Sequence, residues 1–406
     1  MKNKKGIYIK GGRVIDGKGK QPINNEGILI EDNKIIDICA KRKISKDKED
    51  EWEVIDISGK TLMPGLIDCH SHMGNPVGDI REKDIIPIEL TTLLASKDVQ
   101  EVLMAGFTTV RYMGGRGNIE VSVRDAINKD IICGPRLLVS GRIITCTGGL
   151  MDYYPSWFNF IGSGIKINGP NEAINAVREL VKTGVDVIKL EGSGSTHSPY
   201  CPPEKVTLSF EEMKAAVNEA KRHNKKVAIH AENPKSIKDA IKAGVDTIEH
   251  GILIDEECVK MMKENDIYFI PTIGIVQSRY ENIGKEKMPN YIVDRVKYYY
   301  QRHIESLKLA YSAGLKIALG SDVGYGNNIY ELSCMVQHCF TPMEAIVAGT
   351  KIASEVLGLE NIIGTIEVNK IADLIVIEGN PLNNINILLD KNNIKIIIKD
   401  GKIIKI

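Results

Sequence analysis

Five apolar runs along the chain each lead into a side chain that can bind a metal ion. A parallel β-barrel exposes its working side chains at the carboxyl ends of its strands, where segments far apart in sequence meet. The series therefore predicts one shared pocket. The runs span residues 61–68, 185–188, 227–229, 246–249 and 316–321, and they lead into His70 and His72, Lys189, His230, His250 and Asp322.

Strand-like segments alternate with helical patterns between residues 61 and 356. Counting strand–helix units gives a (β/α)8 TIM barrel. A doubly wound open sheet is the alternative, but it would gather polar strand ends at one switch point. We predict strands over 66–72, 107–112, 136–143, 185–190, 226–230, 246–250, 267–272 and 316–321, helices over 172–183, 209–223, 234–243, 255–265 and 289–313, and helix stops at Gly184, Asn224, Gly244 and Gly314.

Both ends of the chain are rich in short β-forming runs. Turn signals such as Asp400-Gly401 separate these runs. Neither end alone has enough strands for a stable sandwich. We therefore predict a composite β-sandwich domain made of residues 1–60 and 357–406, beside a metal-dependent catalytic barrel made of residues 61–356.

Composition excludes several classes of function. Lys+Arg and Asp+Glu both number 53, and aromatic residues make up 5% of the chain, so neither a basic field nor a stacking surface favours nucleic acid. The sequence has neither an apolar run long enough to span a membrane nor a signal-peptide core. The 8 cysteines form no CxxC pair, which is typical of reduced thiols. These features predict a cytoplasmic protein without nucleic-acid or membrane partners.

The histidines predict a two-metal centre. His70 and His72 are two residues apart on a strand, so they share one face. His230 and His250 end two strands separated by one helix, so they lie on adjacent strands. Any of them alone would more often be an ordinary hydrogen-bonded histidine. Together, the two pairs can hold two divalent ions.

Lys189 and Asp322 complete this hypothesis. Two closely spaced ions need a bridging anion, and Lys189 ends the strand that would supply it. A lysine whose neutral amine has captured carbon dioxide becomes an anionic, bidentate carbamate; the alternative is a salt-bridged or solvent-reaching lysine. Asp322 can bind a metal ion and accept a proton from water, or it can be a simple turn aspartate.

With these residues in place, the chain resembles the metal-dependent amidohydrolase superfamily over essentially its full length. Within it the chain is similar to the branch of Xaa-Pro and Xaa-Xaa dipeptidases and imidazolonepropionase-like proteins. The matching motifs lie at residues 64–72, 106–110, 187–190, 227–230, 247–251, 320–322, 372–376 and 379–381, and the branch markers lie at 134–136, 140–142, 147–149 and Lys189.

The resemblance implies one metal ion on His70, His72 and Asp322, and a second on His230 and His250. Lys189, as N6-carboxylysine, would bridge them. Zinc is the default ion for an imidazole-rich site. The resemblance also implies a homo-oligomer. The chain departs from the usual pattern at Tyr112, Leu150, Glu232 and Ser321. None of these departures removes a predicted ligand, and the first three bear on the substrate rather than on the hydrolytic chemistry.

The implied reaction is hydrolysis of an amide bond in a small molecule, a dipeptide or an N-acyl amino acid, including the Xaa-Pro type. Asp322 would be the catalytic acid and base. A cyclic-amide hydrolase of the imidazolone or hydantoin kind and a mononuclear deaminase are alternatives, as is a non-catalytic scaffold protein. A substrate carboxylate would need cationic or hydroxyl partners, and the candidates are Arg142, His197, Tyr200, Arg279 and Tyr325.

Overall fold

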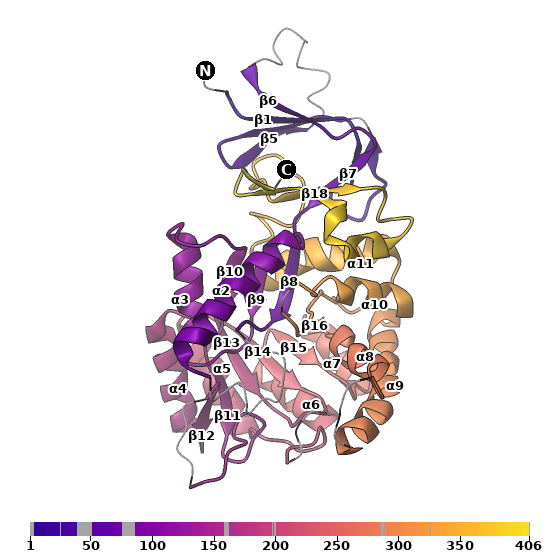
Figure 1. The fold of residues 1–406 in the computed structure, drawn as a ribbon. Helices are drawn as coiled ribbons and strands as arrows, with labels where there is room; N and C mark the ends of the chain where they lie inside the picture. Colours follow the sequence, from indigo (N-terminus) through magenta and orange to yellow (C-terminus); the bar gives the residue numbers. More distant parts are fainter. Residues whose placement is uncertain are drawn as a thin grey trace.

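The computed structural model places an α/β barrel beside a β-rich region (Figure 1). The strands from both ends of the sequence, coloured indigo and yellow, lie together at the top of the view. No helix in the described part of the chain combines the length and apolar character needed to cross a bilayer. The structure describes residues 4–24, 26–38, 51–74, 86–157, 162–196, 198, 200–285, 288, 290–324 and 326–405.

Parallel strands form the barrel. One sheet has the order β10-β9-β8, and a second has the order β12-β11-β13-β14-β15-β16. The Asp186 amide donates to the Val139 carbonyl at 2.8 Å and so joins the two sheets. The barrel strands are β8 (Leu66–Ser71), β9 (Phe107–Tyr112), β10 (Arg136–Val139), β11 (Ile143–Cys146), β12 (Gly164–Ile167), β13 (Val187–Glu191), β14 (Lys226–Ala231), β15 (Thr247–His250) and β16 (Tyr268–Ile270).

The segment before Asp322 closes the barrel. Ile317 forms a parallel bridge with Phe269, and the Cys69 amide donates to the Leu319 carbonyl at 2.9 Å. The segment therefore lies between β16 and β8, although only a bridge, rather than the strand predicted over 316–321, is formed there. This closure brings the segment that bears Asp322, the last predicted ligand, beside the strand that bears the first.

The strand predicted over 136–143 is wrong in one respect, because it is two strands. Gly141 has a φ of 66°, a left-handed conformation that ends β10. The chain then turns into β11, which pairs with β12 and contacts β13 at Ile144 and Leu190. The extra pair of strands lies beside β13, the strand that bears Lys189.

The five predicted helices are confirmed to within two residues at each end. All four predicted stops adopt left-handed conformations, with φ values of 89° at Gly184, 54° at Asn224, 93° at Gly244 and 71° at Gly314. The helices are α2 (Ile88–Met104), α3 (Ile119–Asn128), α4 (Pro170–Thr183), α5 (Phe210–Arg222), α6 (Pro234–Ala243), α7 (Glu256–Glu264), α8 (Ile273–Glu281), α9 (Asn290–Ser312), α10 (Tyr330–His338), α11 (Pro342–Val347) and α12 (Ala353–Leu357).

Strands from both ends of the chain form two further sheets with the orders β5-β4-β1-β6 and β19-β18-β17-β7-β2-β3. A common apolar core includes Ile9, Ile28, Leu62 and Val376. The strands are β1 (Ile7–Lys10), β2 (Arg13–Val14), β3 (Ile23–Asn24), β4 (Ile28–Glu31), β5 (Lys34–Ile38), β6 (Glu53–Asp56), β7 (Lys60–Pro64), β17 (Leu374–Glu378), β18 (Ile394–Lys399) and β19 (Lys402–Lys405).

Gly65 connects these sheets to the barrel. It stands between β7 and β8, and a Cβ atom at this position would lie 2.2 Å from Thr108 Oγ1. Only glycine therefore allows β8 to pack this closely against β9. The junction fixes the start of the strand that bears His70 and His72.

Candidate metal centre

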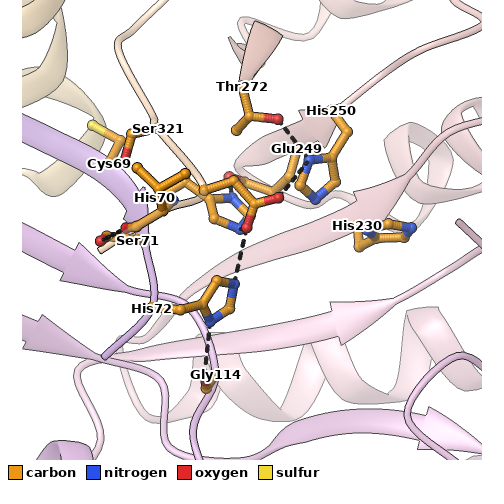
Figure 2. Close-up of polar contacts among 12 residues, drawn as sticks. Cys69, His70, Ser71, His72, Gly114, His230, Glu249, His250, Thr272 and Ser321 are labelled. Atoms are coloured by element: carbon orange, nitrogen blue, oxygen red, sulfur yellow. Dashed lines mark hydrogen bonds and ion pairs between the residues drawn. The ribbon is translucent and has the colours of Figure 1, made fainter. Parts of the chain in front are cut away.

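Four imidazoles gather around one space at the strand ends (Figure 2). The ring centroids of His230 and His250 are 4.5 Å apart, those of His70 and His250 are 4.8 Å apart, and those of His70 and His72 are 5.4 Å apart. Asp322 lies against this cluster, because its Oδ1 is 3.2 Å from His72 Nε2 and 3.6 Å from His70 Nε2. The structure thus brings together five side chains that the sequence predicted as ligands.

Each imidazole uses one ring nitrogen for a hydrogen bond to the protein. Such a bond fixes the ring orientation and the tautomer, so that the second nitrogen can bind a metal ion. The bonds are His70 Nδ1 to Glu249 Oε2 at 2.6 Å, His72 Nδ1 to the Gly114 carbonyl at 2.9 Å, His230 Nε2 to the Gly194 carbonyl at 3.0 Å and His250 Nδ1 to Thr272 Oγ1 at 2.8 Å.

Burial keeps most of these rings neutral. It lowers the pKa of His70 to about 4 and that of His230 to about 3. Burial also lowers the pKa of His250 well below its ordinary value. A metal ligand must be an unprotonated imidazole. The three rings are therefore ready to bind a divalent cation at neutral pH.

Lys189 lies on β13 and is buried, with 2% of its surface exposed. Its Nζ has no hydrogen-bond partner among the described residues. Burial lowers the pKa of the amine to about 8, so a larger share of the amine is neutral at pH 7 than in an ordinary lysine. A buried ammonium without a partner is unfavourable, whereas a neutral amine can react with carbon dioxide.

Three residues at the site adopt left-handed backbone conformations. The φ angles are 69° for His250, 52° for Thr272 and 55° for Asp322. Such conformations are uncommon for residues with a side chain, and for the β-branched Thr272 this is a true outlier. Local strain of this kind is typical of functional sites. The unusual backbone turns His250 and Asp322 out of the regular strand direction.

Glu249 and Arg111 form a buried support behind His70. Glu249 Oε2 accepts from His70 Nδ1, and Oε1 accepts from Arg111 Nη2 at 2.9 Å. Burial raises the pKa of the Glu249 carboxyl, but Arg111, Lys189 and His70 together outweigh it, and the net pKa lies well below the ordinary value. The carboxylate therefore stays ionised and holds His70 in the tautomer that leaves Nε2 available.

A second buried carboxylate positions the segment that bears Asp322. Asp68 accepts from Ser321 Oγ at 2.6 Å, from the Ser321 amide at 3.1 Å and from Asn328 Nδ2 at 2.7 Å. The Asp322 amide in turn donates to the His70 carbonyl at 2.7 Å. Strand β8 and the closing segment are thus tied together directly beneath the cluster.

The predicted substrate-binding residues lie in different settings. Arg142 donates from Nε to the Gly162 carbonyl at 3.0 Å and from Nη2 to the Gly164 carbonyl, so it holds the chain that enters β12. Tyr200 is 73% exposed. Arg279 has a buried Nη1 without a partner among the described residues, and burial lowers the pKa of its guanidinium to about 10, while Asp322 opposes this change. His197 and Tyr325 lie outside the described residues.

Sequence reasoning named neither Glu249, Arg111 nor Thr272 as part of the site. One signal was present, because Arg111 and Glu249 are charged residues inside apolar strands and such residues must be paired. Nothing in the sequence gives the distance between two strands far apart in the chain, so the partner of each charge could not be identified.

Comparison with known proteins shows the family to which this chain belongs. The model of the amidohydrolase family matches residues 61–404. The chain belongs to the amidohydrolase family. Members of the family are generally metal-dependent, and His70, His250 and Asp322 offer ligand atoms that all lie within 4.8 Å of one another. The protein is a hydrolase that acts on carbon–nitrogen bonds.

Individual relatives of this amidohydrolase act on different compounds. Ochratoxinase of Aspergillus niger is 30% identical over 431 residues, covering 98% of this chain and 86% of the relative. Imidazolonepropionase of Geobacillus thermodenitrificans is 21% identical over 416 residues, covering 95% and 91%. A crystal structure of a Xaa-Pro dipeptidase with methionine bound in its active site has a TM-score of 0.90 and 33% identity, covering 98% and 99%.

Proposed function

We propose that this amidohydrolase uses two divalent metal ions to cleave the amide bond of a dipeptide or an N-acyl amino acid. The observation that supports this most strongly is the orientation of the imidazoles. Each of the four rings is held through one nitrogen by the protein. The second nitrogen lies 3.6 Å from Asp322 Oδ1 in His70 and 3.2 Å from it in His72, beside their predicted fellow ligand, and it is left for a ligand bond in His230 and His250. This is the arrangement of histidines that bind metal ions.

The donor set fits zinc. Imidazole nitrogen and carboxylate oxygen are both ordinary zinc ligands. His70, His72 and Asp322 would hold one ion, and His230 and His250 would hold the other. The unpartnered, buried Nζ of Lys189 fits conversion to N6-carboxylysine, because the carbamate would supply the bridging negative charge that two cations need.

The residues of the chain then have distinct tasks. When bound, the ions would lower the pKa of a water molecule and polarise the substrate carbonyl. Asp322 lies beside His70 and His72, where its carboxylate can accept the proton of the attacking water and pass it to the leaving nitrogen. Glu249 holds His70 in place during these steps.

Arg279 is the best-supported partner for a substrate carboxylate. Its Nη1 is buried without a hydrogen-bond partner in the part of the chain that the structure describes, and its guanidinium lies close enough to Asp322 for that charge to affect its pKa. A guanidinium binds a carboxylate through parallel hydrogen bonds. Arg142 and Tyr200 have weaker support, because Arg142 binds backbone carbonyls and Tyr200 is largely exposed.

Similarity to imidazolonepropionase keeps the cyclic-amide reading as the second candidate. The two readings share the metal centre and differ in the substrate. We further propose that the two sheets formed by the chain ends are a composite β-sandwich domain, which their shared core supports. Homo-oligomerisation and a cytoplasmic location stay predictions from the sequence.

A substrate screen combined with a Lys189→Ala variant tests the proposal. The wild-type enzyme, reconstituted with zinc and bicarbonate, is expected to hydrolyse linear dipeptides or N-acyl amino acids and to release a free amine. Lys189→Ala should lower this activity by at least about a hundredfold, since a bridging ligand is lost, and short carboxylic acids should restore part of it. Full activity of the variant would contradict the carbamate bridge, and turnover of cyclic ureides alone would favour the second candidate.

A further inference from the structure

Glu232 is a buried carboxylate beside the metal centre that no step above uses. It follows the last residue of β14, two positions after His230, and only 2% of its surface is exposed. Its backbone is fixed on both sides, because its amide donates to Ser193 Oγ at 2.8 Å and its carbonyl accepts from the Leu253 amide at 3.0 Å. The side chain therefore starts from a rigid position at the rim of the cluster.

The carboxylate is only partly satisfied. The Ser195 hydroxyl and the Thr196 amide are hydrogen-bond partners of the group, but Oε2 has no partner within the described part of the chain. Oε1 lies 3.6 Å from His230 Nε2, and that ring nitrogen already bonds to the Gly194 carbonyl. No lysine or arginine among the described residues forms an ion pair with Glu232.

A buried carboxylate of this kind requires a cationic or hydrogen-bond-donating partner. Burial, together with the acidic neighbours Asp322 and Glu204, raises the pKa of Glu232 to about 8, so the ionised form needs a partner. A partner that the described residues do not provide can be supplied by the substrate. We propose that Glu232 binds the protonated amino group of the substrate, and that the enzyme therefore prefers dipeptides with a free amino terminus over N-acyl amino acids.

The covalent geometry of a dipeptide places its ammonium where this contact is possible. The nitrogen is two bonds from the scissile carbonyl carbon, a distance of about 2.5 Å. A carbonyl that reacts beside His230 must therefore bring its ammonium to the edge of the same cluster. Arg279, whose Nη1 has no partner among the residues described, would bind the carboxylate at the opposite end of the dipeptide. This inference rests on the proposed function and specifies its substrate class.

Matched substrates that differ only in the amino group test the inference. L-alanyl-L-proline and N-propionyl-L-proline form one such pair, and L-alanyl-L-phenylalanine and N-propionyl-L-phenylalanine form another. In the wild-type zinc enzyme, kcat/KM should be at least about tenfold higher for the alanyl compound, as expected for a charged hydrogen bond. In Glu232→Gln this preference should disappear, while kcat/KM for the propionyl compound changes by less than about threefold.

Two further measurements separate the alternatives. Zinc content of Glu232→Gln should equal that of the wild type, and a loss of zinc with equal loss of activity on both substrates would show that Glu232 is a metal ligand instead. Glu204→Gln is the control, because this neighbouring acidic residue is exposed; it should keep the wild-type preference. Equal preference in the wild type and Glu232→Gln would overturn the inference and leave the proposed function intact.

A binding assay covers the case in which none of these compounds is hydrolysed, which would contradict the proposed function itself. L-alaninamide should raise the unfolding temperature of the zinc-loaded wild type more than propionamide does, and this difference should vanish in Glu232→Gln. Equal shifts for both amides in the wild type would overturn the ammonium site independently of turnover.

Discussion

Glu249→Gln tests how the protein prepares His70 for metal binding. Glu249 is completely buried and lies between His70 Nδ1 at 2.6 Å and Arg111 Nη2 at 2.9 Å. Glutamine has the same shape but only one acceptor oxygen. If that oxygen faces Arg111, the amide NH2 faces His70 and forces Nδ1 to accept, which places the proton on Nε2. If the oxygen faces His70, two donors meet at Arg111.

Both arrangements weaken the site. The first blocks the nitrogen that would bind the ion, and the second leaves a buried guanidinium without its counter-charge. Loss of a carboxylate partner behind a histidine ligand lowers metal affinity by about 10–100-fold, or about 1.4–2.7 kcal/mol. The unpaired Arg111 should also lower the free energy of unfolding of the metal-free protein by about 3–5 kcal/mol.

A chelator competition titration measures the metal affinity, and urea denaturation of the metal-free protein measures the free energy of unfolding. Glu331→Gln is a matched control. Glu331 is also buried at the barrel mouth, but it accepts from the backbone amides of Ile273 and Gly274 and contacts no predicted ligand. The Glu331→Gln variant should have a lower free energy of unfolding than the wild type but the same affinity for zinc. Unchanged zinc affinity in Glu249→Gln would refute the reasoning about the His70 tautomer.

Two further predictions concern stability. Gly65→Ala should lower the free energy of unfolding by about 1–3 kcal/mol, measured in urea, because its Cβ would overlap Thr108; equal stability would show that β8 can shift. Partial burial raises the pKa of Glu367, but hydrogen bonds from Lys18, Thr365 and Lys370 outweigh it and lower the pKa to about 2. A folded-state pKa below the unfolded value stabilises the protein above about pH 4.5 and loses this effect as pH falls toward 2. The free energy of unfolding of the wild type should therefore exceed that of Glu367→Gln by about 1 kcal/mol near pH 6, a value reduced because the side chain is partly exposed. The difference should be smaller near pH 3.5. A difference that does not change with pH would contradict the assignment.

Much of the scaffold could be predicted from the sequence, because local patterns determine it. Apolar runs followed by polar side chains, and glycine or asparagine stops such as Gly184 and Asn224, report strand and helix ends directly. The order of the predicted ligands along the chain follows from this periodicity. The division of one predicted strand at Gly141 was missed, since a single glycine inside an apolar run does not reveal its φ angle.

The finer features of the site depend on contacts between distant segments. The left-handed backbone of His250 and Asp322 leaves no mark in the sequence, because both residues also occur in ordinary conformations. Arg142 donates to the Gly162 carbonyl beside β12, and its predicted contact with the substrate stays a prediction. A long, charged side chain reaches several neighbours, and only the folded structure shows which one it binds.

The metal content of the purified enzyme tests the central claim most directly. Protein reconstituted with zinc in the presence of bicarbonate, freed of excess ion and measured by elemental analysis, should contain two zinc ions per chain. The same measurement on Lys189→Ala should give one ion or fewer. A single tightly held ion in the wild type, unchanged in Lys189→Ala, would contradict a bridged pair and would favour a mononuclear deaminase.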